Sequence, residues 1–136
     1  MDDRLREPPY PFQGHVGFTI DDWQQDYCRL SQPMLPHLGN RYGIPHGGVM
    51  ATLLDTALGY AVCYTGDPDN KQLVMTLSLN VQYLSVARGE MMIAEGRKTG
   101  GGKSVAFAEG DIRDENGTVI ATATATFKYR SGKGKP

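Results

Sequence analysis

The sequence predicts an α+β fold in which one long helix lies against an antiparallel sheet. A dense apolar segment over residues 49–62 predicts the helix, and four later segments with β-rich patterns predict strands. The links between those strands are short, whereas a parallel return needs a crossover of about a dozen residues, so the strands must run antiparallel. With 136 residues in the chain, we expect a single domain over 1–136, because two domains would each have a marginal core.

The composition is that of an ordinary globular protein, with 40% hydrophobic residues, 21% charged residues and a formal net charge of -1. This balance argues against a protein that grips nucleic acid by bulk charge. No apolar run approaches the ~20 residues of a membrane span, and no signal-peptide pattern is visible. Cys28 and Cys63 are too few for a disulfide framework and fit a reducing compartment. We therefore expect a cytoplasmic protein that binds neither nucleic acid nor membrane.

Before the predicted helix, the chain shows a lead-in, a strand and a loop. Prolines cluster around aromatic residues at the start, so residues 1–16 are expected to be irregular. Residues 27–31 predict a strand, which the prolines that follow bring to an end. Residues 37–45 then form a loop that leads into the helix.

The predicted helix follows Gly47 and Gly48 and spans residues 49–62. Its apolar positions are so dense that it must be covered on most sides. Its small residues would let a neighbouring element approach closely. One sheet cannot enclose such a helix, so a second copy of the chain is a natural source of the remaining cover, in a homodimer or a dimer-of-dimers tetramer.

The strands after the helix form the most regular part of the sequence. Apolar and polar residues alternate over residues 73–83, which predicts a long strand. Three further strands are predicted over residues 91–98, 103–113 and 118–129. Asn116-Gly117 joins the last two and is the best short hairpin signal. With the strand before the helix, these segments predict a five-stranded sheet, followed by a flexible polar tail over 131–136.

Asp55 breaks the apolar pattern of the helix. A buried, unpaired carboxylate is costly, so Asp55 must be hydrogen-bonded, protonated or facing a cavity. On a narrow solvent-facing stripe it would be an ordinary surface residue. In a cleft it would act as a nucleophile or general base, and the scarcity of polar residues on this helix favours the cleft.

His46-Gly47-Gly48 stands at the entrance of the helix. The first turn of a helix has unpaired N–H groups and the positive end of the dipole, and glycines let a ligand approach that backbone. A glycine turn that feeds a helix is the simpler explanation of these residues taken alone. The carboxylate nine residues after His46 favours a site for an oxyanion or a polarised carbonyl.

Three segments of the sequence together resemble a known family. They are residues 40–48, which begin with Asn40 and end with His46-Gly47-Gly48, residues 53–55 and residues 80–85. In order and spacing they resemble the PaaI-like acyl-CoA thioesterases of the hotdog fold, over roughly residues 40–129. The resemblance implies a long central helix wrapped by a five-stranded antiparallel sheet. It also implies homo-oligomers whose active sites are shared between subunits.

The resemblance also implies roles for individual residues. In that family an acid on the helix is the nucleophile or general base, which gives this role to Asp55. The N–H of Gly47 would polarise the thioester carbonyl, and Asn40 would hold the thioester or the attacking water. His46 would pack and hydrogen-bond beside them, and Thr76 would contribute a hydroxyl from the long strand.

Coenzyme A would enter as part of the substrate, and the resemblance implies no metal or redox cofactor. Gly48 joins the substrate-binding set because it leaves the helix backbone open to a ligand. Arg88 and Lys103 would contact the phosphates of coenzyme A, although solvated hairpin ends are the simpler explanation. Gly102-Lys103-Ser104 imitates the end of a phosphate-binding loop, but the first glycine and the helix which that motif requires are missing.

The sequence therefore predicts a thioesterase that hydrolyses an acyl- or aryl-acyl-CoA, without specifying the acyl group. Two alternatives stay open. A hotdog hydratase or dehydratase would pair a catalytic histidine with an acid in another motif. A non-catalytic acyl-CoA binding module would keep the pocket but would not need Asp55. Release of free thiol from a panel of acyl-CoAs separates the three.

Overall fold

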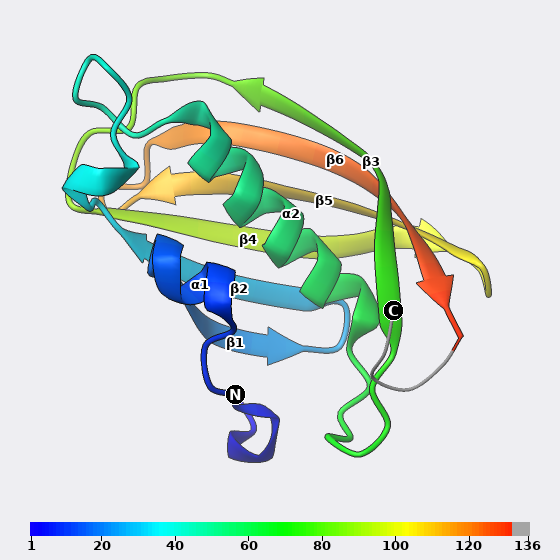
Figure 1. Cartoon of the computed structure of the whole chain (residues 1–136). Coiled ribbons are helices and arrows are strands. Elements are labelled where there is room, and N and C mark those ends of the chain that lie inside the picture. The colour runs from blue at the N-terminus through cyan, green and yellow to red at the C-terminus, as the bar shows by residue number, and fades with distance from the viewer. Residues whose placement is uncertain (132–136) are drawn as a thin grey trace.

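The computed structural model describes residues 1–131, which form one long helix packed against a six-stranded antiparallel sheet (Figure 1). The strands are β1 (Thr19–Gln24), β2 (Tyr27–Pro33), β3 (Leu73–Tyr83), β4 (Met91–Gly101), β5 (Val105–Asp114) and β6 (Val119–Arg130). The long helix is α2 (Gly47–Cys63), and the shorter helical segments are η1 (Asp3–Leu5), α1 (Pro11–Val16) and η2 (Pro36–Leu38). The strand order is β1-β2-β4-β5-β6-β3, so β3 forms one edge of the sheet.

This architecture confirms the expected α+β class, the long central helix and the strand over residues 73–83. The expectation of five strands is wrong, because β1 adds a sixth strand next to β2. Gln25 and Asp26 form the turn between them, and Asp26 adopts a φ of 61°, a left-handed conformation that aspartate tolerates. A bulge between Ile20 and Asp22 also breaks the regular alternation of β1.

The first residues are more regular than expected. Residues 1–16 contain η1 and α1 rather than an irregular lead-in. Gln13, which is only 8% exposed, donates through its side-chain amide to the Phe18 carbonyl at 3.1 Å and accepts from the Tyr10 N–H at 3.4 Å. These two bonds fix α1 against the start of β1. From residue 132 onward, the predicted tail lies outside the described residues.

One face of α2 packs on the sheet at backbone distance. Gly96 of β4 and Gly110 of β5 are paired in register beneath the helix. A Cβ atom built on Gly96 would lie 2.6 Å from the Ala57 carbonyl oxygen, and one built on Gly110 would lie 2.7 Å from a Leu58 methyl group. The helix residues buried on this face are Met50, Leu53, Leu54, Ala57, Leu58, Ala61 and Val62. No helix within residues 1–131 has the length and apolar character needed to cross a membrane.

Strand β3 runs beside α2 and bends sharply about halfway along its length (Figure 1). Its register with β6 shifts between Thr76 and Ser78, and such bulges bend the strand that carries them. Val74 packs against the core on the helix side, whereas Met75 and Leu77 are 45% and 51% exposed. The bulge therefore leaves apolar side chains uncovered along this edge.

Candidate active site

The structure brings Asp55 and Thr76 together, two residues that the family resemblance assigns to one site. The Thr76 hydroxyl donates a hydrogen bond to the Asp55 carboxylate at 2.7 Å. Asp55 is half-buried on the side of α2 that faces away from the inner core. One oxygen of this carboxylate is held by the strand, and the group stands on a helix with no other acidic residue. The catalytic roles of both residues remain predictions.

His46 acts as the N-cap of α2. Its Nδ1 accepts a hydrogen bond from the Gly48 N–H at 2.8 Å, so the neutral ring carries its proton on Nε2. A Cβ atom on Gly48 would lie 3.0 Å from this Nδ1, which explains why a glycine follows. The Gly48 N–H is thus occupied by His46 and cannot also bind substrate. The role of Gly48 in substrate binding stays a prediction, and it would have to rest on contacts other than this N–H.

Gly47 lies between that cap and Tyr83 of β3. The Tyr83 hydroxyl donates to the Gly47 carbonyl at 2.8 Å, and a Cβ on Gly47 would touch the tyrosine ring at 3.3 Å. Within residues 1–131 the Gly47 N–H has no hydrogen-bond partner. This N–H is therefore the donor that the start of α2 offers to a ligand. Sequence reasoning missed the Tyr83 contact, although Tyr83 lies in one of the motif segments.

Asn40 organises the loop that leads into α2. Its side-chain oxygen accepts from the N–H of Tyr42 at 2.8 Å and of Ile44 at 3.4 Å. Its own N–H donates to the Ile44 carbonyl at 2.7 Å, which closes the loop before His46. The side-chain oxygen is thus used within the loop, so only the Nδ2 amide could hold a thioester or a water as predicted.

Tyr10 is a neighbour of Asp55 that sequence reasoning missed. Burial raises the pKa of Tyr10, the Thr56 hydroxyl lowers it through a hydrogen bond, and the charge of Asp55 raises it. The tyrosine therefore lies beside the same stretch of α2 that carries the carboxylate. The aromatic residues among the prolines of the lead-in were the available signal, but sequence alone does not show where they pack.

The Gly47 N–H and the Asp55 carboxylate of one chain are too far apart to act on the same carbonyl. They are separated by eight residues of helix, which corresponds to about 12 Å along its axis. Reacting atoms and their oxyanion donors must lie about 3 Å from a common point. Within one chain, these two groups therefore do not meet at a common point.

The basic residues proposed for coenzyme A do not form one cluster. Arg88 precedes β4 and Lys103 follows it, and both are exposed. The eleven residues of β4 span about 33 Å, so the two side chains lie at opposite ends of the sheet. The expected phosphate-binding group is therefore not assembled within one chain.

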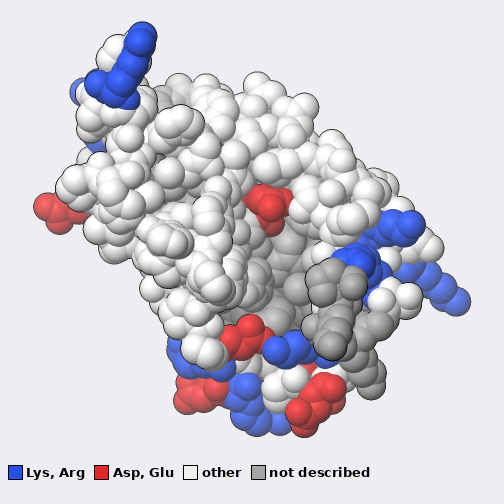
Figure 2. All heavy atoms as spheres, in the orientation of Figure 1, with Lys and Arg blue, Asp and Glu red and all other residues white. Residues whose placement is uncertain are grey.

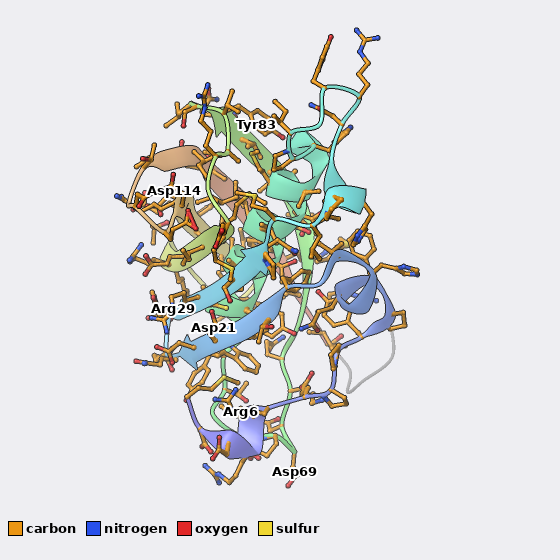
Figure 3. All side chains as sticks on the ribbon, turned by 90° about the vertical axis from the view of Figure 1, so that its left-hand side faces the viewer. Arg6, Asp21, Arg29, Asp69, Tyr83 and Asp114 are labelled. Atoms are coloured by element: carbon orange, nitrogen blue, oxygen red, sulfur yellow. The ribbon has the colours of Figure 1, made fainter. Side chains whose placement is uncertain are left out.

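The surface over α2 is mostly uncharged, and charged side chains gather around its rim (Figure 2). A single acidic group stands within this uncharged surface, and the surface is hollowed beside it (Figure 2). Asp55 is the only acidic residue of α2. Tyr83 lies at one end of the molecule, and Arg6 and Asp69 lie at the other (Figure 3).

Comparisons with known proteins identify the family and support the fold. A family model described as the Thioesterase superfamily matches residues 42–121. The medium/long-chain acyl-CoA thioesterase YigI of Escherichia coli is 31% identical over 133 residues, which cover 86% of this chain and 84% of YigI. A thioesterase family protein from Silicibacter pomeroyi superposes with a TM-score of 0.80 at 26% identity, covering 90% of this chain and 91% of that one.

The PaaI protein of Escherichia coli superposes with a TM-score of 0.78, covering 89% of this chain and 85% of PaaI. At 16% identity this likeness supports the fold alone. The family model spans more than half of the chain, and YigI matches most of it. The chain therefore belongs to the Thioesterase superfamily and is a thioester hydrolase with the hotdog fold.

Proposed function

We propose that this protein hydrolyses acyl-CoA thioesters and that Asp55 supplies the attack. The observation that carries the proposal is the Asp55 carboxylate, which accepts a hydrogen bond from the Thr76 hydroxyl at 2.7 Å and is the only acidic group of α2. The name of YigI, a medium/long-chain acyl-CoA thioesterase, supports acyl-CoA as the substrate class. Because the chain is a thioester hydrolase, the non-catalytic binding module and the hydratase are disfavoured.

The chemistry follows from the groups that are present. As a general base, Asp55 takes a proton from water, and the resulting hydroxide adds to the thioester carbonyl carbon. As a nucleophile, its carboxylate adds directly and forms an anhydride that water then opens. In both routes the C–S bond breaks, coenzyme A leaves as the thiol, and the acyl group becomes a free acid. The Gly47 N–H would stabilise the oxyanion, a contribution of about 10²–10³ in rate for one donor.

We further propose that a second copy of the chain completes each site. The edge of β3 is unpaired within residues 1–131 and carries exposed apolar side chains. Pairing two β3 edges would join the sheets into one of twelve strands, rather than the ten expected from five-stranded subunits. It would also place the two α2 helices side by side, so that the Gly47 N–H, His46 and Asn40 of one chain meet Asp55 of the other. Dimers of such dimers are compatible with this arrangement.

Arg88 lies at the Gly47 end of the molecule and remains our candidate for contact with coenzyme A phosphates. Lys103, at the opposite end of β4, would reach the same coenzyme A only from another subunit. The reaction consumes water and needs no cofactor apart from the coenzyme A of its substrate. A cytoplasmic location fits that substrate and the two free cysteines.

The first test is release of free thiol from a panel of acyl-CoAs that includes aliphatic and aryl groups. We expect hydrolysis of at least one member by the purified protein. Absence of thiol release from the whole panel, in a folded preparation, would refute the proposal. Formation of a hydrated or dehydrated acyl-CoA without thiol release would instead support the hydratase alternative.

The second test addresses the shared site. We would unfold an inactive Asp55→Asn variant and an inactive Asn40→Ala variant together and then refold the mixture. If the sites are shared, a mixed dimer has one site with both defects and one with neither. About half of the dimers form as mixed pairs by random association, so about a quarter of wild-type activity should return. No recovery in demonstrably mixed dimers would show that both residues act within one chain.

A further inference from the structure

Gly59 is a glycine that the packing of α2 does not require. It lies in the helix interior, where glycine is less favourable than alanine. A Cβ atom at Gly59 would meet only the ring of Phe127, at 3.5 Å, which is ordinary van der Waals contact. By contrast, a Cβ atom on Gly96 would collide with helix backbone. The missing side chain at Gly59 therefore leaves space rather than relieving a clash.

That space lies next to the reactive carboxylate. Gly59 follows Asp55 by four residues, so the two positions occupy the same face of α2, one turn apart. Cys63 follows by another four residues on the same face. A chain bound at Asp55 could therefore run along the helix past Gly59 without meeting a side chain at that position.

A hollow lies where this path ends. It has a volume of about 440 Å³, within the range of small-ligand sites, and it lies between the first residues of the chain, the C-terminal end of α2 and the start of β3. Its apolar lining includes Leu5, Trp23, Tyr60 and Leu73. Cys63 also lines it, at about 12 Å from Asp55 along the helix axis.

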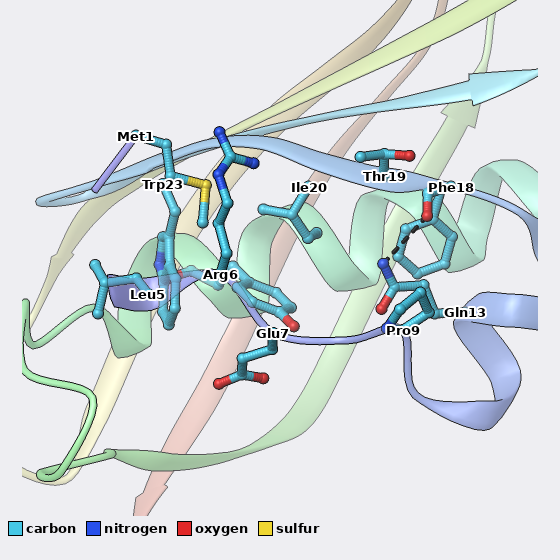
Figure 4. Close-up of a pocket in the computed structure, with 11 residues that line it drawn as sticks. Met1, Leu5, Arg6, Glu7, Pro9, Gln13, Phe18, Thr19, Ile20 and Trp23 are labelled. Atoms are coloured by element: carbon cyan, nitrogen blue, oxygen red, sulfur yellow. Dashed lines mark hydrogen bonds between the residues drawn. The ribbon is translucent and has the colours of Figure 1, made fainter. Parts of the chain in front are cut away.

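Residues 5–7 of the N-terminal segment line this hollow and a second one beside it. Leu5, Trp23 and Tyr60 line both, so the two hollows adjoin each other. In the second hollow, Leu5 and Trp23 stand at one end and Phe18 at the other (Figure 4). The Trp23 indole donates to the Tyr60 carbonyl at 2.8 Å, which fixes the aromatic wall to the helix.

An ion pair crosses the outer end of the larger hollow. The Lys71 ammonium lies 3.0 Å from the Glu7 carboxylate, and both residues belong to the lining. The pair joins the N-terminal segment to the segment before β3, which are far apart in sequence. Both side chains are about half exposed, so the pair contributes little to stability. It stands where the end of a long chain would emerge.

We propose that the gap at Gly59 and the hollow lined by Leu5, Trp23, Tyr60 and Leu73 bind an unbranched aliphatic acyl chain, with the Glu7–Lys71 pair limiting its length. This proposal rests on the proposed acyl-CoA hydrolysis and specifies its substrate class. Cys63, which lines the hollow, follows Asp55 by eight residues, or about 12 Å of helix axis, and an extended alkyl chain spans that length better than a compact aryl group does. Burial of each methylene in such a site favours longer chains until the pair blocks them.

The test is a chain-length profile of kcat/KM, from acetyl-CoA to palmitoyl-CoA with phenylacetyl-CoA included. Gly59→Leu places a good helix former in the gap. We expect kcat/KM for the best aliphatic substrate of the wild type to fall about tenfold or more, as steric discrimination in apolar pockets allows. The shortest acyl-CoA that the wild type hydrolyses should change less than about twofold, because it does not reach Gly59.

Gly59→Ala is the matched stability probe. We expect its Tm to equal or exceed that of the wild type, because the gap accepts a methyl group and alanine favours the helix. A clear fall in Tm would show that packing requires Gly59 and would overturn the argument. Should Gly59→Leu fail to fold, Leu73→Trp fills the hollow from β3 and should give the same loss of long-chain activity.

Lys71→Ala tests the outer end of the hollow, with Lys128→Ala, an exposed lysine on β6, as its control. Opening the pair should shift the optimum to longer chains, raising the ratio of palmitoyl-CoA to octanoyl-CoA turnover about threefold or more. The control should keep the wild-type profile.

Suppose that the wild type hydrolyses acyl-CoAs but that Gly59→Leu and Leu73→Trp keep its chain-length profile or reduce kcat/KM equally for all substrates. Only this inference is then wrong. If no acyl-CoA is hydrolysed by the wild type, the proposed function itself fails.

Discussion

Glycines serve opposite purposes at the two faces of α2. On the inner face, Gly96 of β4 lets the helix backbone approach so closely that a methyl group would collide with it, and a Cβ on Gly110 of β5 would collide with the Leu58 side chain. On the outer face, a methyl group would fit at position 59, but the residue there is a glycine. The inner face is a closely packed support, and the outer face is an open surface that carries Asp55.

This difference shows how one helix can be both core and active site. Close packing on one side fixes the axis of α2, so a carboxylate on the other side is positioned without being enclosed. The experiments that follow test this division. Changes on the outer face should alter activity and spare stability, whereas changes beneath the inner face should do the reverse.

The largest effect is expected for Asp55→Asn. Loss of a positioned base should lower kcat by about two to four orders of magnitude, because the amide cannot take the proton or attack the thioester. Stability should stay near that of the wild type, since the substitution preserves shape. Thiol release and thermal unfolding measure the two quantities, with the exposed Asp69→Asn as control. Turnover near the wild-type value would end the catalytic assignment.

Gly96→Ala is the corresponding change beneath the inner face. The added Cβ would lie 2.6 Å from the Ala57 carbonyl oxygen, so the helix must move away from β4. Overpacking of this kind costs about 1–3 kcal/mol of unfolding free energy. Urea denaturation measures it against Gly102→Ala, where a Cβ meets nothing within 4 Å. Equal midpoints for the two variants would contradict the close-packed support.

Thr76→Ala should have a smaller effect on catalysis than Asp55→Asn. The Thr76 hydroxyl positions the carboxylate but does not replace the attacking group, so we expect about a tenfold loss of kcat, or about 1.4 kcal/mol. Thr76→Ser keeps the hydroxyl and should restore most of the rate, with KM little changed in either variant. A loss as large as that of Asp55→Asn, without rescue by serine, would show that the two residues are ranked wrongly.

The two thiols differ in burial, so they test the hollow beside Cys63 without any change of sequence. Burial raises the pKa of Cys63 to about 12 and raises that of Cys28 as well, so both stay protonated at neutral pH. Alkylation should therefore be slow, and its rate at Cys63 should rise about tenfold per pH unit between pH 8 and 10 as the thiolate fraction grows. Mass spectrometry should find Cys63, in the hollow, modified before the fully buried Cys28. The reverse order would contradict the open outer face.

Long periodic patterns made most of the fold predictable. The strand over residues 73–83 and the helix after Gly47-Gly48 were predicted almost to the residue. The strand β1 was missed because its bulge breaks the alternation and its turn contains no glycine. The helix α1 was missed because its N-cap is Tyr10, which is not a usual capping residue, and because the bond from Gln13 to the Phe18 carbonyl depends on the fold.

The site was predictable where chemistry is local and not where it depends on packing. Asp55 stood out as an acid on an apolar helix, and the resemblance pointed to Thr76. The occupation of the Gly48 N–H by His46 is also local, but two glycines in sequence do not reveal which N–H stays free. Tyr10 lies beside Asp55 only because the N-terminal segment folds back over α2. Neither composition nor spacing carries that information.

The uncovered edge of β3 has a consequence for the newly made protein. Within residues 1–131, its unpaired backbone groups and exposed Met75 and Leu77 form a template that any extended polypeptide can join. Under the proposed pairing of β3 edges, each new chain faces a kinetic competition between meeting its own copy and binding unrelated nascent chains. Synthesis of several chains from one messenger, which raises the local concentration of matching edges, would favour the productive encounter over misassembly.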